Sequence, residues 1–400
     1  MSHERPPLHL LAALGTLSLV AFGVWFYGYG VLLEPIRQDT GWPEALLTTT
    51  YGLSLLLTGV GAVAVGRAVD HGHARRVFAA AAVVASMTLA LASFVASPLA
   101  FAALVTVAGG AIGAGGYYPA TQAAITHAAP RSRTKAITGI TLFGAFASPV
   151  FLPVIGWLVS TVGWRPTLRL LSGVVALSFA WAAIATPSGT GRDASRVPFV
   201  TALRHVWRQQ DLRRFVLAGG AAGVATSLLF LYQVPVMVDA GLALTLASTL
   251  AGARGLVQLA GRLPLPPVVR RIGSDRSLRG SFVLVAISIV LLLGSGNLAV
   301  AFAFVAVAGV ATGAMAALEG IYGGDLHTEQ LGTLLGAFSL VRGLGAALGP
   351  ALGGVAVGLL GSRVPALLVG AAAALAAAAL IPPLRRVRSR ESQRSVHLGS

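Results

Sequence analysis

Long apolar runs, interrupted by short loops in which the charged residues collect, dominate this sequence of 400 residues. A helix that crosses the hydrocarbon core of a bilayer, about 30 Å thick, needs roughly 20 predominantly apolar residues. Twelve stretches are of this kind, near residues 8–33, 44–68, 77–96, 98–128, 136–161, 166–186, 214–238, 244–268, 280–295, 297–320, 332–358 and 363–383. Only 10% of the residues are charged, against about 25% in soluble domains. The sequence therefore predicts an all-α polytopic membrane protein with twelve transmembrane helices.

The distribution of basic residues predicts the topology of these helices. If the N-terminus is cytoplasmic, the inner segments hold 22 Lys and Arg residues and the outer loops hold 4. The positive-inside rule then predicts a multi-pass protein of the plasma (inner) membrane with both termini in the cytoplasm. A nucleic-acid partner is not expected, because the net charge of +16 is spread over short loops and not clustered on a solvated face. All but one of the 29 basic residues are arginine, which indicates a GC-rich bacterial genome.

The two halves of the chain resemble each other at an offset close to 200 residues. Three pairs of segments carry the repeat: Gly66–Asp70 with Pro266–Arg270, Gly109–Gly116 with Gly309 and Gly313, and Ser148-Pro149 with Gly349-Pro350. Two parallel six-helix bundles with pseudo-symmetry are expected, with a substrate path between them near the bilayer midplane. The predicted parts are an N-terminal bundle (1–186), a cytoplasmic linker (187–213), a C-terminal bundle (214–384) and a basic cytoplasmic tail (385–400).

The linker also has a helical pattern. Phe199, Leu203, Val206 and Trp207 fall on one face at helical spacing. This pattern fits a short helix on the inner membrane surface, and it fits a solvated linker helix equally well.

One loop resembles the signature of a known transporter family. It reads Gly66-Arg67-Ala68-Val69-Asp70-His71-Gly72-His73-Ala74-Arg75-Arg76. The major facilitator superfamily has Gly-x-x-x-Asp-(Arg/Lys)-x-Gly-x-(Arg/Lys)-(Arg/Lys) between its second and third helices, and this chain departs from it at His71. The resemblance implies a cytoplasmic gate in which Gly66 allows close helix approach. Asp70 either caps a helix or forms an ion pair, and together with Arg75 and Arg76 it holds the cytoplasmic side through charge-assisted contacts. The second copy has Arg270 in place of the aspartate, so the gate is not expected to be symmetric.

Shorter motifs are similar to the monocarboxylate and oxalate/formate branch of that superfamily. They are Gly41-Trp42-Pro43-Glu44-Ala45, Gly163-Trp164-Arg165, Gly261-Arg262 and the glycines from Gly345 to Gly354. This resemblance implies that the substrate is a mono- or dicarboxylate. Gln258 lies four residues before Arg262, where the branch often has an acidic residue.

Three arginines lie inside predicted spans, namely Arg254, Arg262 and Arg342. Arginine inside a bilayer is costly, so each marks a candidate functional site. At about 1.5 Å per residue, Arg262 and Arg342 lie roughly 12 Å and 15 Å from the inner edge, where no acidic partner is expected. The pair is therefore predicted to bind a carboxylate, the alternative being that both satisfy helix-end carbonyls or extend to the inner surface. Two interpretations of Arg254 stay open: it is a contact for anions on the outer part of their path, or it forms an ion pair with Asp239.

Other polar side chains complete the candidate site. Tyr27, Tyr118, Gln122 and Gln258 are expected beside the substrate, although intramembrane tyrosines also serve packing alone. If transport is linked to protons, the carboxylates available for coupling are Glu319, Asp239 and Glu34.

Missing residue types exclude other activities. The chain has no cysteine and its histidines lie in loops, tails and span ends, so no metal site or cofactor is expected. The only lysine is Lys135, and without a Walker loop ATP-driven transport is excluded. We therefore expect that the chain is not an enzyme. We expect a monomeric secondary transporter that moves a small organic anion by alternating access, coupled to a proton or a counter-anion. The alternatives are a drug exporter of the same superfamily and a sensor built on a transporter fold.

Overall fold

The computed structural model describes residues 7–129, 132–189, 207–326 and 331–384, and within them it contains helices and no strand. The N-terminal half holds α1 (Leu8–Ala21), η1 (Phe22–Tyr27), α2 (Tyr29–Thr40), α3 (Glu44–Asp70), α4 (Ala74–Ala92), α5 (Pro98–Gly116), α6 (Tyr118–Ala128), α7 (Arg133–Ala145), α8 (Ala147–Val162) and α9 (Trp164–Ala185). The C-terminal half holds α11 (Gln210–Asp239), α12 (Leu244–Arg262), α13 (Leu265–Ile272), α14 (Ser274–Leu293), α15 (Leu298–Leu326), α16 (Leu331–Leu360) and α17 (Val364–Leu380).

These helices form the predicted twelve crossings. Among the described residues, ten helical segments are long and apolar enough to cross a membrane, and α17 is a shorter apolar helix. The remaining crossing is α12, whose apolar character is reduced by Arg254 and Arg262. The all-α fold of twelve transmembrane helices in two bundles is thus confirmed.

Several crossings are made of more than one helix. The first consists of α1, the π-helix η1 and α2, the fourth of α5 and α6, and the fifth of α7 and α8. The predicted span 244–268 is also divided, because Pro264 and two following prolines separate α12 from α13. Proline lacks the N–H that a continuing helix needs, and it is well tolerated in the first turn of a new one.

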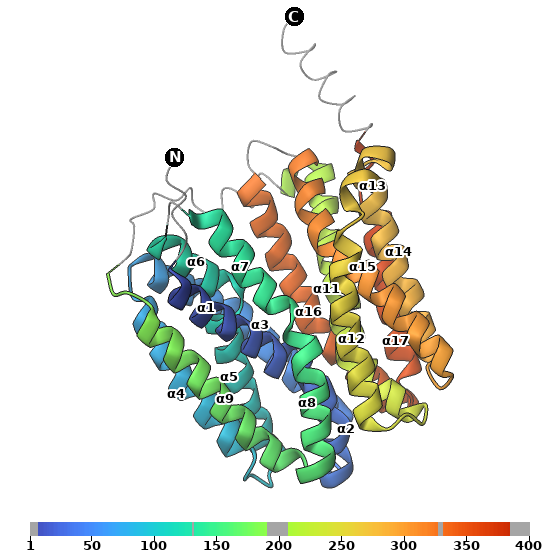
Figure 1. Cartoon of the computed structure of the whole chain (residues 1–400). Coiled ribbons are helices and arrows are strands. Elements are labelled where there is room, and N and C mark those ends of the chain that lie inside the picture. The colour runs from blue at the N-terminus through green and yellow to red at the C-terminus, as the bar shows by residue number, and fades with distance from the viewer. Residues whose placement is uncertain (1–6, 130–131, 190–206, 327–330, 385–400) are drawn as a thin grey trace, which may run out of the picture.

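The two bundles lie side by side, and the start of α1 and the end of α17 lie at the same end of the molecule (Figure 1). We call this the terminal end and the opposite one the Arg363 end. Toward the Arg363 end α3 packs against α16 and α8 packs against α12. A side chain at Gly52 of α3 would collide with the backbone carbonyl of Ala347 in α16. The glycine therefore lets the two halves approach to backbone contact.

The halves are separated in the other half of the membrane-spanning region. A pocket of about 590 Å³ opens there between α3, α5 and α16, and its lining includes Val60, Arg67, Tyr117 and Leu340. Gly59 and Gly343 both line this pocket, and a side chain on either would meet no atom within 4 Å. The molecule is thus closed at the Arg363 end and open toward the terminal end.

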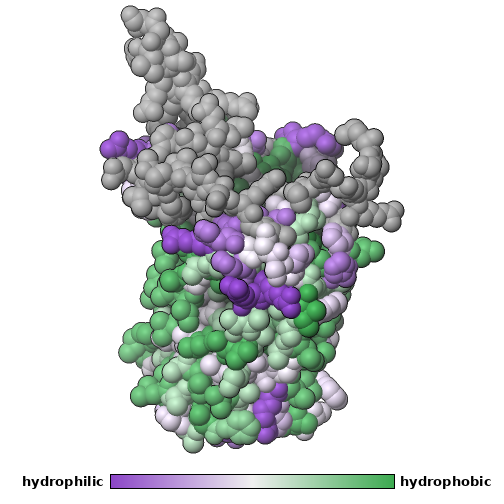
Figure 2. All heavy atoms as spheres, turned by 90° about the vertical axis from the view of Figure 1, so that its left-hand side faces the viewer, coloured by the Kyte–Doolittle hydropathy of each residue, from purple (hydrophilic) through white to green (hydrophobic). Residues whose placement is uncertain are grey.

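The flank of the N-terminal bundle is apolar. Large apolar side chains are exposed along α4 and α9, among them Met87, Leu91, Leu177 and Ile184. Figure 2 shows this apolar flank beneath a belt of hydrophilic residues that lies toward the terminal end. Such a surface is stable in contact with lipid, and the chain is a multi-pass membrane protein.

Two predicted segments fall outside the described residues. These are most of the linker helix, with Phe199, Leu203 and Val206, and the basic tail 385–400. Trp207, the last residue of the linker pattern, is described and is exposed just before α11.

Candidate functional site

Arg254 lies in the middle of α12 with 0% of its surface exposed. Its Nε donates to Gln233 Oε1 of α11 at 3.0 Å, and its Nη1 donates to Thr312 Oγ1 of α15 at 3.4 Å. Its Cζ lies 4.5 Å from the ring centre of Phe230 and 5.7 Å from that of Tyr27. Nη2 has no hydrogen-bond partner among the described residues, and no described carboxylate pairs with this arginine. A buried cation without a counter-charge is costly and is rarely retained without a role.

Arg254 is one end of a polar row on α12. Gln258 and Arg262 follow at intervals of four residues, which places all three on one side of the helix at steps of about 6 Å. Arg262 is exposed, Gln258 is half-buried and Arg254 is fully buried. Gln258 Nε2 donates to the same Thr312 Oγ1 at 3.1 Å. The row therefore leads from the open region near the terminal end to the buried guanidinium.

Six aromatic residues form a continuous surface next to Arg254. We call them the aromatic cluster: Phe22, Phe26, Tyr27, Tyr117, Tyr118 and Phe230. Phe22 stacks on Tyr117 at 4.3 Å, and Phe26 contacts Phe230 edge-on at 5.7 Å. The second contact joins the two bundles, because Phe26 belongs to η1 and Phe230 to α11.

Local irregularities of the backbone place these rings. The π-helix η1 contains Phe22, Phe26 and Tyr27, and π-helical turns inside helices occur frequently at functional sites. Tyr51 of α3 fixes it by donating to the carbonyl of Phe26 at 2.7 Å. Tyr117 adopts an extended conformation between α5 and α6. This break in the fourth crossing turns Tyr117 and Tyr118 toward Phe22.

The prediction that Arg342 has no acidic partner is wrong. Arg342 of α16 forms an ion pair with Glu319 of α15, and their side chains are 26% and 13% exposed. The span around Glu319 was predicted to end at residue 320, whereas α15 continues to Leu326. Glu319 therefore lies about 10 Å inside the helix end. Of the two arginines predicted to bind a carboxylate together, Arg262 has no carboxylate partner among the described residues and Arg342 has one.

The remaining predicted substrate-site residues lie near the open region. Tyr118 is half-buried, and its hydroxyl lies 3.5 Å from the carbonyl oxygen of Thr141. Gln122 is half-buried one turn further along α6. Gln233, Thr312 and Phe230, the contacts of Arg254, were not predicted from the sequence. Gln233 is an amide inside a predicted span, as Gln258 is, and this signal could have found it. Thr312 and Phe230 do not differ in the local sequence from packing residues.

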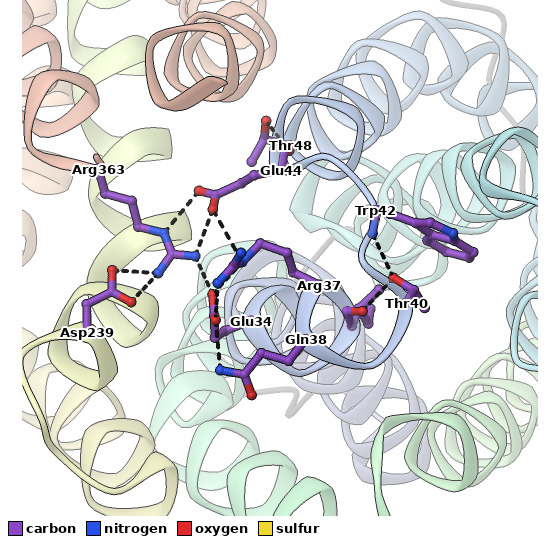
Figure 3. A network of polar contacts seen from close by, with 10 residues as sticks. Glu34, Arg37, Gln38, Thr40, Trp42, Glu44, Thr48, Asp239 and Arg363 are labelled. Carbon is purple, nitrogen blue, oxygen red and sulfur yellow. Dashed lines mark hydrogen bonds and ion pairs between the residues drawn. The ribbon is translucent and has the colours of Figure 1, made fainter. Parts of the chain in front are cut away.

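A network of charged residues closes the Arg363 end (Figure 3). Arg363, in the turn before α17, binds three carboxylates, those of Glu34, Glu44 and Asp239. Its Nη1 lies 2.7 Å and 2.6 Å from the two oxygens of Asp239. Arg37 adds a second cation through Glu34, with its Nη2 at 2.6 Å from Oε1. We call these five residues the Arg363 network.

The Arg363 network spans both bundles, because Glu34, Arg37 and Glu44 belong to the first and Asp239 and Arg363 to the second. Two predictions change as a result. Asp239 pairs with Arg363, so of the two interpretations of Arg254 the one in which it pairs with Asp239 is wrong. Glu34 and Asp239, which were candidates for proton coupling, take part in this closure.

The short motifs around Trp42 and Trp164 lie at the same end. The first motif supplies Glu44 to the Arg363 network. Its Trp42 packs on Phe101, and Phe101 in turn packs on Trp164. Trp164 Nε1 donates to Asp39 Oδ2 at 2.9 Å, and Arg165 pairs with the same carboxylate. These contacts hold together the loops of one bundle.

The loop that resembles the family signature lies at the terminal end. Asp70 Oδ1 is 3.1 Å from His127 Nε2 of α6, which is a contact within the first bundle. Arg75 and Arg76 are exposed, and the predicted pairing of Asp70 with them is not among the contacts between described residues. A Cβ at Gly66 would meet no atom within 4 Å, so the close helix approach predicted at this glycine is not present in this structure. Among the described residues, no group of three or more His, Asp or Glu side chains is arranged to hold a metal ion.

Comparison with known proteins gives one family and one fold. No curated protein is significantly similar to the chain in sequence. A crystal structure of the nucleoside transporter NupG superposes with a TM-score of 0.77 at 14% identity, covering 93% of this chain and 98% of that one. A bacterial homolog of the human lysosomal transporter Spinster, in an inward-facing and unoccupied conformation, gives a TM-score of 0.70 at 16% identity, covering 94% of this chain and 95% of that one. At these identities the likeness concerns the fold.

The sequence profile of the Major Facilitator Superfamily matches the chain twice, over residues 13–253 and 216–398. Together the two matches, which overlap over residues 216–253, cover nearly the whole chain. The chain belongs to the Major Facilitator Superfamily of membrane transporters.

Proposed function

We propose that this transporter moves small organic anions by alternating access, with Arg254 as the central binding residue. The observation that carries the proposal is the buried guanidinium of Arg254, which has no carboxylate partner and a free Nη2 among the described residues. An anionic substrate would neutralise this charge in a low dielectric. Arginine also suits a planar carboxylate, because its N–H groups match the two oxygens.

The row on α12 supports an entry route for an anion. Arg262 presents an exposed positive charge at the open end of this row, and Gln258 offers an amide between the two arginines. A cation at the mouth of a cleft raises the local concentration of anions. In this proposal Arg262 attracts the substrate and Arg254 binds it, which replaces the pairing of Arg262 with Arg342.

The excess of basic residues at the terminal end supports a cytoplasmic location for that end. With this orientation in the plasma membrane, the structure is open to the cytoplasm and closed by the Arg363 network on the outside. The chain would work as a monomer, because both bundles and the site between them belong to one chain. Proton coupling would then be assigned first to Glu319, which pairs with Arg342 of α16 and takes no part in the Arg363 network.

The alternative, export of cationic drugs, has less support in the structure. A cationic substrate would need an available carboxylate along the path. Among the described intramembrane carboxylates, Glu319 pairs with Arg342, and Glu34 and Glu44 pair with Arg363. A neutral substrate, such as a nucleoside of the kind that the nucleoside transporter NupG moves, would leave Arg254 without a counter-charge.

The test is uptake into liposomes that contain the purified protein. The panel holds labelled acetate, oxalate and benzoate, a lipophilic cation and a nucleoside. We expect saturable uptake of at least one carboxylate. Arg254→Lys keeps the charge but loses the planar fork, and it should weaken uptake roughly 30-fold or more, corresponding to a lost contact worth about 2 kcal/mol or above.

Arg271→Gln is the matched control, since Arg271 is an exposed arginine of α13 away from the row on α12. It removes one positive charge and should transport like the parent. The proposal would be overturned if only the cation or the nucleoside is taken up. It would also be overturned if a monodisperse Arg254→Lys protein takes up the carboxylate as fast as the parent.

A further inference from the structure

We infer that the preferred substrates are monocarboxylates whose carboxyl group is bonded to an aromatic ring. The inference rests on the proposed function, because it takes Arg254 as the binding residue for the carboxylate. It adds that the aromatic cluster binds the rest of the molecule. The two claims concern different side chains and can fail separately.

The aromatic cluster begins at the guanidinium. Phe230 lies 4.5 Å from Arg254 Cζ, and Phe26 lies 5.7 Å from Phe230. Tyr27 contacts both rings, at 5.1 Å from Phe26 and 5.5 Å from Phe230. A carboxylate on Arg254 would therefore place a directly attached ring beside these aromatic side chains. Their spacing is within the 4.5–7 Å range of favourable aromatic pairs.

The cluster also offers free ring surface. Phe22, Phe26, Tyr27 and Tyr118 are half-buried although they lie between the two bundles. Tyr117 is buried, and its hydroxyl has no hydrogen-bond partner among the described residues. A cluster that served packing alone would bury its rings and satisfy this hydroxyl. Partly exposed aromatic residues and an unused hydroxyl are complementary to an apolar ring with a polar substituent.

Other anions fit this arrangement less well. A small dicarboxylate needs two cations close together, whereas Arg254 and Arg262 are about 12 Å apart along the helix. Arg342, the third intramembrane arginine, is already paired with Glu319. One unpaired buried cation beside several rings favours one carboxylate and one ring.

The test is displacement of labelled benzoate from the purified full-length protein in detergent. The competitors are cyclohexanecarboxylate, acetate, oxalate and benzamide. Cyclohexanecarboxylate matches benzoate in charge and approximate size but has no π system, and benzamide keeps the ring but has no charge. We expect benzoate to bind roughly 3- to 10-fold more tightly than cyclohexanecarboxylate, the range expected for aromatic pairs beyond apolar burial.

Two variants separate the ring contribution from the charge contribution. Phe26→Leu should reduce the preference for benzoate over cyclohexanecarboxylate and leave the affinity for acetate unchanged. Phe302→Leu is the control, because Phe302 is 56% exposed on the outer face of α15, and it should bind like the parent. A variant that unfolds would lose acetate as well, so the acetate measurement detects it.

The outcomes distinguish the two claims. The aromatic preference is overturned if benzoate and cyclohexanecarboxylate bind with equal affinity, or if acetate or oxalate binds more tightly than benzoate. If carboxylate binding still depends on Arg254 in that case, the proposed anion transport stands. The proposed function and this inference are both overturned if benzamide binds as tightly as benzoate, or if carboxylate binding does not depend on Arg254.

Discussion

Arg363 and Glu44, which are 319 positions apart in the chain, form a two-point ion pair between the two bundles. Arg363 Nε lies 3.0 Å from Glu44 Oε1, and Nη2 lies 2.7 Å from Oε2. Both side chains are less than 10% exposed. Paired, planar contacts of this kind are strong and directional. They hold the bundles together at one end and are incompatible with a path open there.

Arg363→Met should therefore open the Arg363 end. It leaves three carboxylates with Arg37 as the remaining cation of the network, and removing one partner of a buried pair costs about 3–5 kcal/mol. The chain has no native cysteine, so a single cysteine reports access without background. We expect Thr48→Cys, at a buried position where α3 meets α16, to react with a maleimide several-fold faster when Arg363→Met is added.

Arg165→Met is the control for this experiment. Arg165 also pairs with a carboxylate at the Arg363 end, but its partner Asp39 belongs to the same bundle. The variant should leave the labelling rate of Thr48→Cys unchanged. Equal labelling with Arg363→Met and without it would show that the network does not hold this end closed.

The ion pair between Glu319 and Arg342 predicts a specific pattern of stabilities. Glu319→Gln and Arg342→Gln each leave one charge without its partner, so each should lower the melting temperature of the protein in detergent. The double variant should recover part of the loss, with a coupling energy of about 0.5–3 kcal/mol. Additive losses would contradict the pairing. A parent-like pH profile of transport in Glu319→Gln would remove Glu319 as the coupling carboxylate.

The sequence predicted the crossings well and the pairing of charges poorly, for physical reasons. Apolar length determines which segments cross a bilayer, and this information is local. The depth of Glu319 was misjudged because α15 extends beyond the apolar run, through Gly323 and Gly324 to Leu326. Hydrophobicity alone does not indicate where a helix continues into water.

The contacts of Arg254 and Arg363 depend on the packing of distant segments. Thr312 is 58 positions from Arg254, and Glu34 is 329 positions from Arg363. The sequence does show that Arg254 lies inside a membrane span. It also shows that Glu34 and Asp239 lie at helix ends and that Arg363 lies in a loop. It does not show the rotation of each helix about its axis, which decides the partners.

Asp70 should matter more for transport than the arginines that follow it. Asp70 contacts His127 and so ties α3 to α6 within one bundle, whereas Arg75 and Arg76 are exposed. Asp70→Asn should slow liposome uptake severely while the protein still inserts and remains monodisperse. Arg75→Gln should have the smaller effect. The reverse order, or parent-like uptake by Asp70→Asn, would contradict the role of Asp70 in the gate.

The glycines that face open space predict where the halves meet in the other conformation. Gly59 of α3 and Gly343 of α16 line the pocket between the bundles, and a side chain on either would meet no atom within 4 Å. Glycine lowers the stability of a helix by up to about 1 kcal/mol relative to alanine. Its presence at both positions is explained if α3 and α16 come into backbone contact when the terminal end closes, as they already do at Gly52.

Gly343→Leu should therefore be tolerated in the structure described and should block transport. We expect an unchanged or higher melting temperature, together with loss of liposome uptake, because the leucine side chain prevents closure of the terminal end. Gly280→Leu is the matched control, since a Cβ at Gly280 of α14 would also meet no atom within 4 Å, and this glycine does not line the pocket. It should transport like the parent. If Gly343→Leu transports normally, α3 and α16 do not approach each other at this position during the cycle.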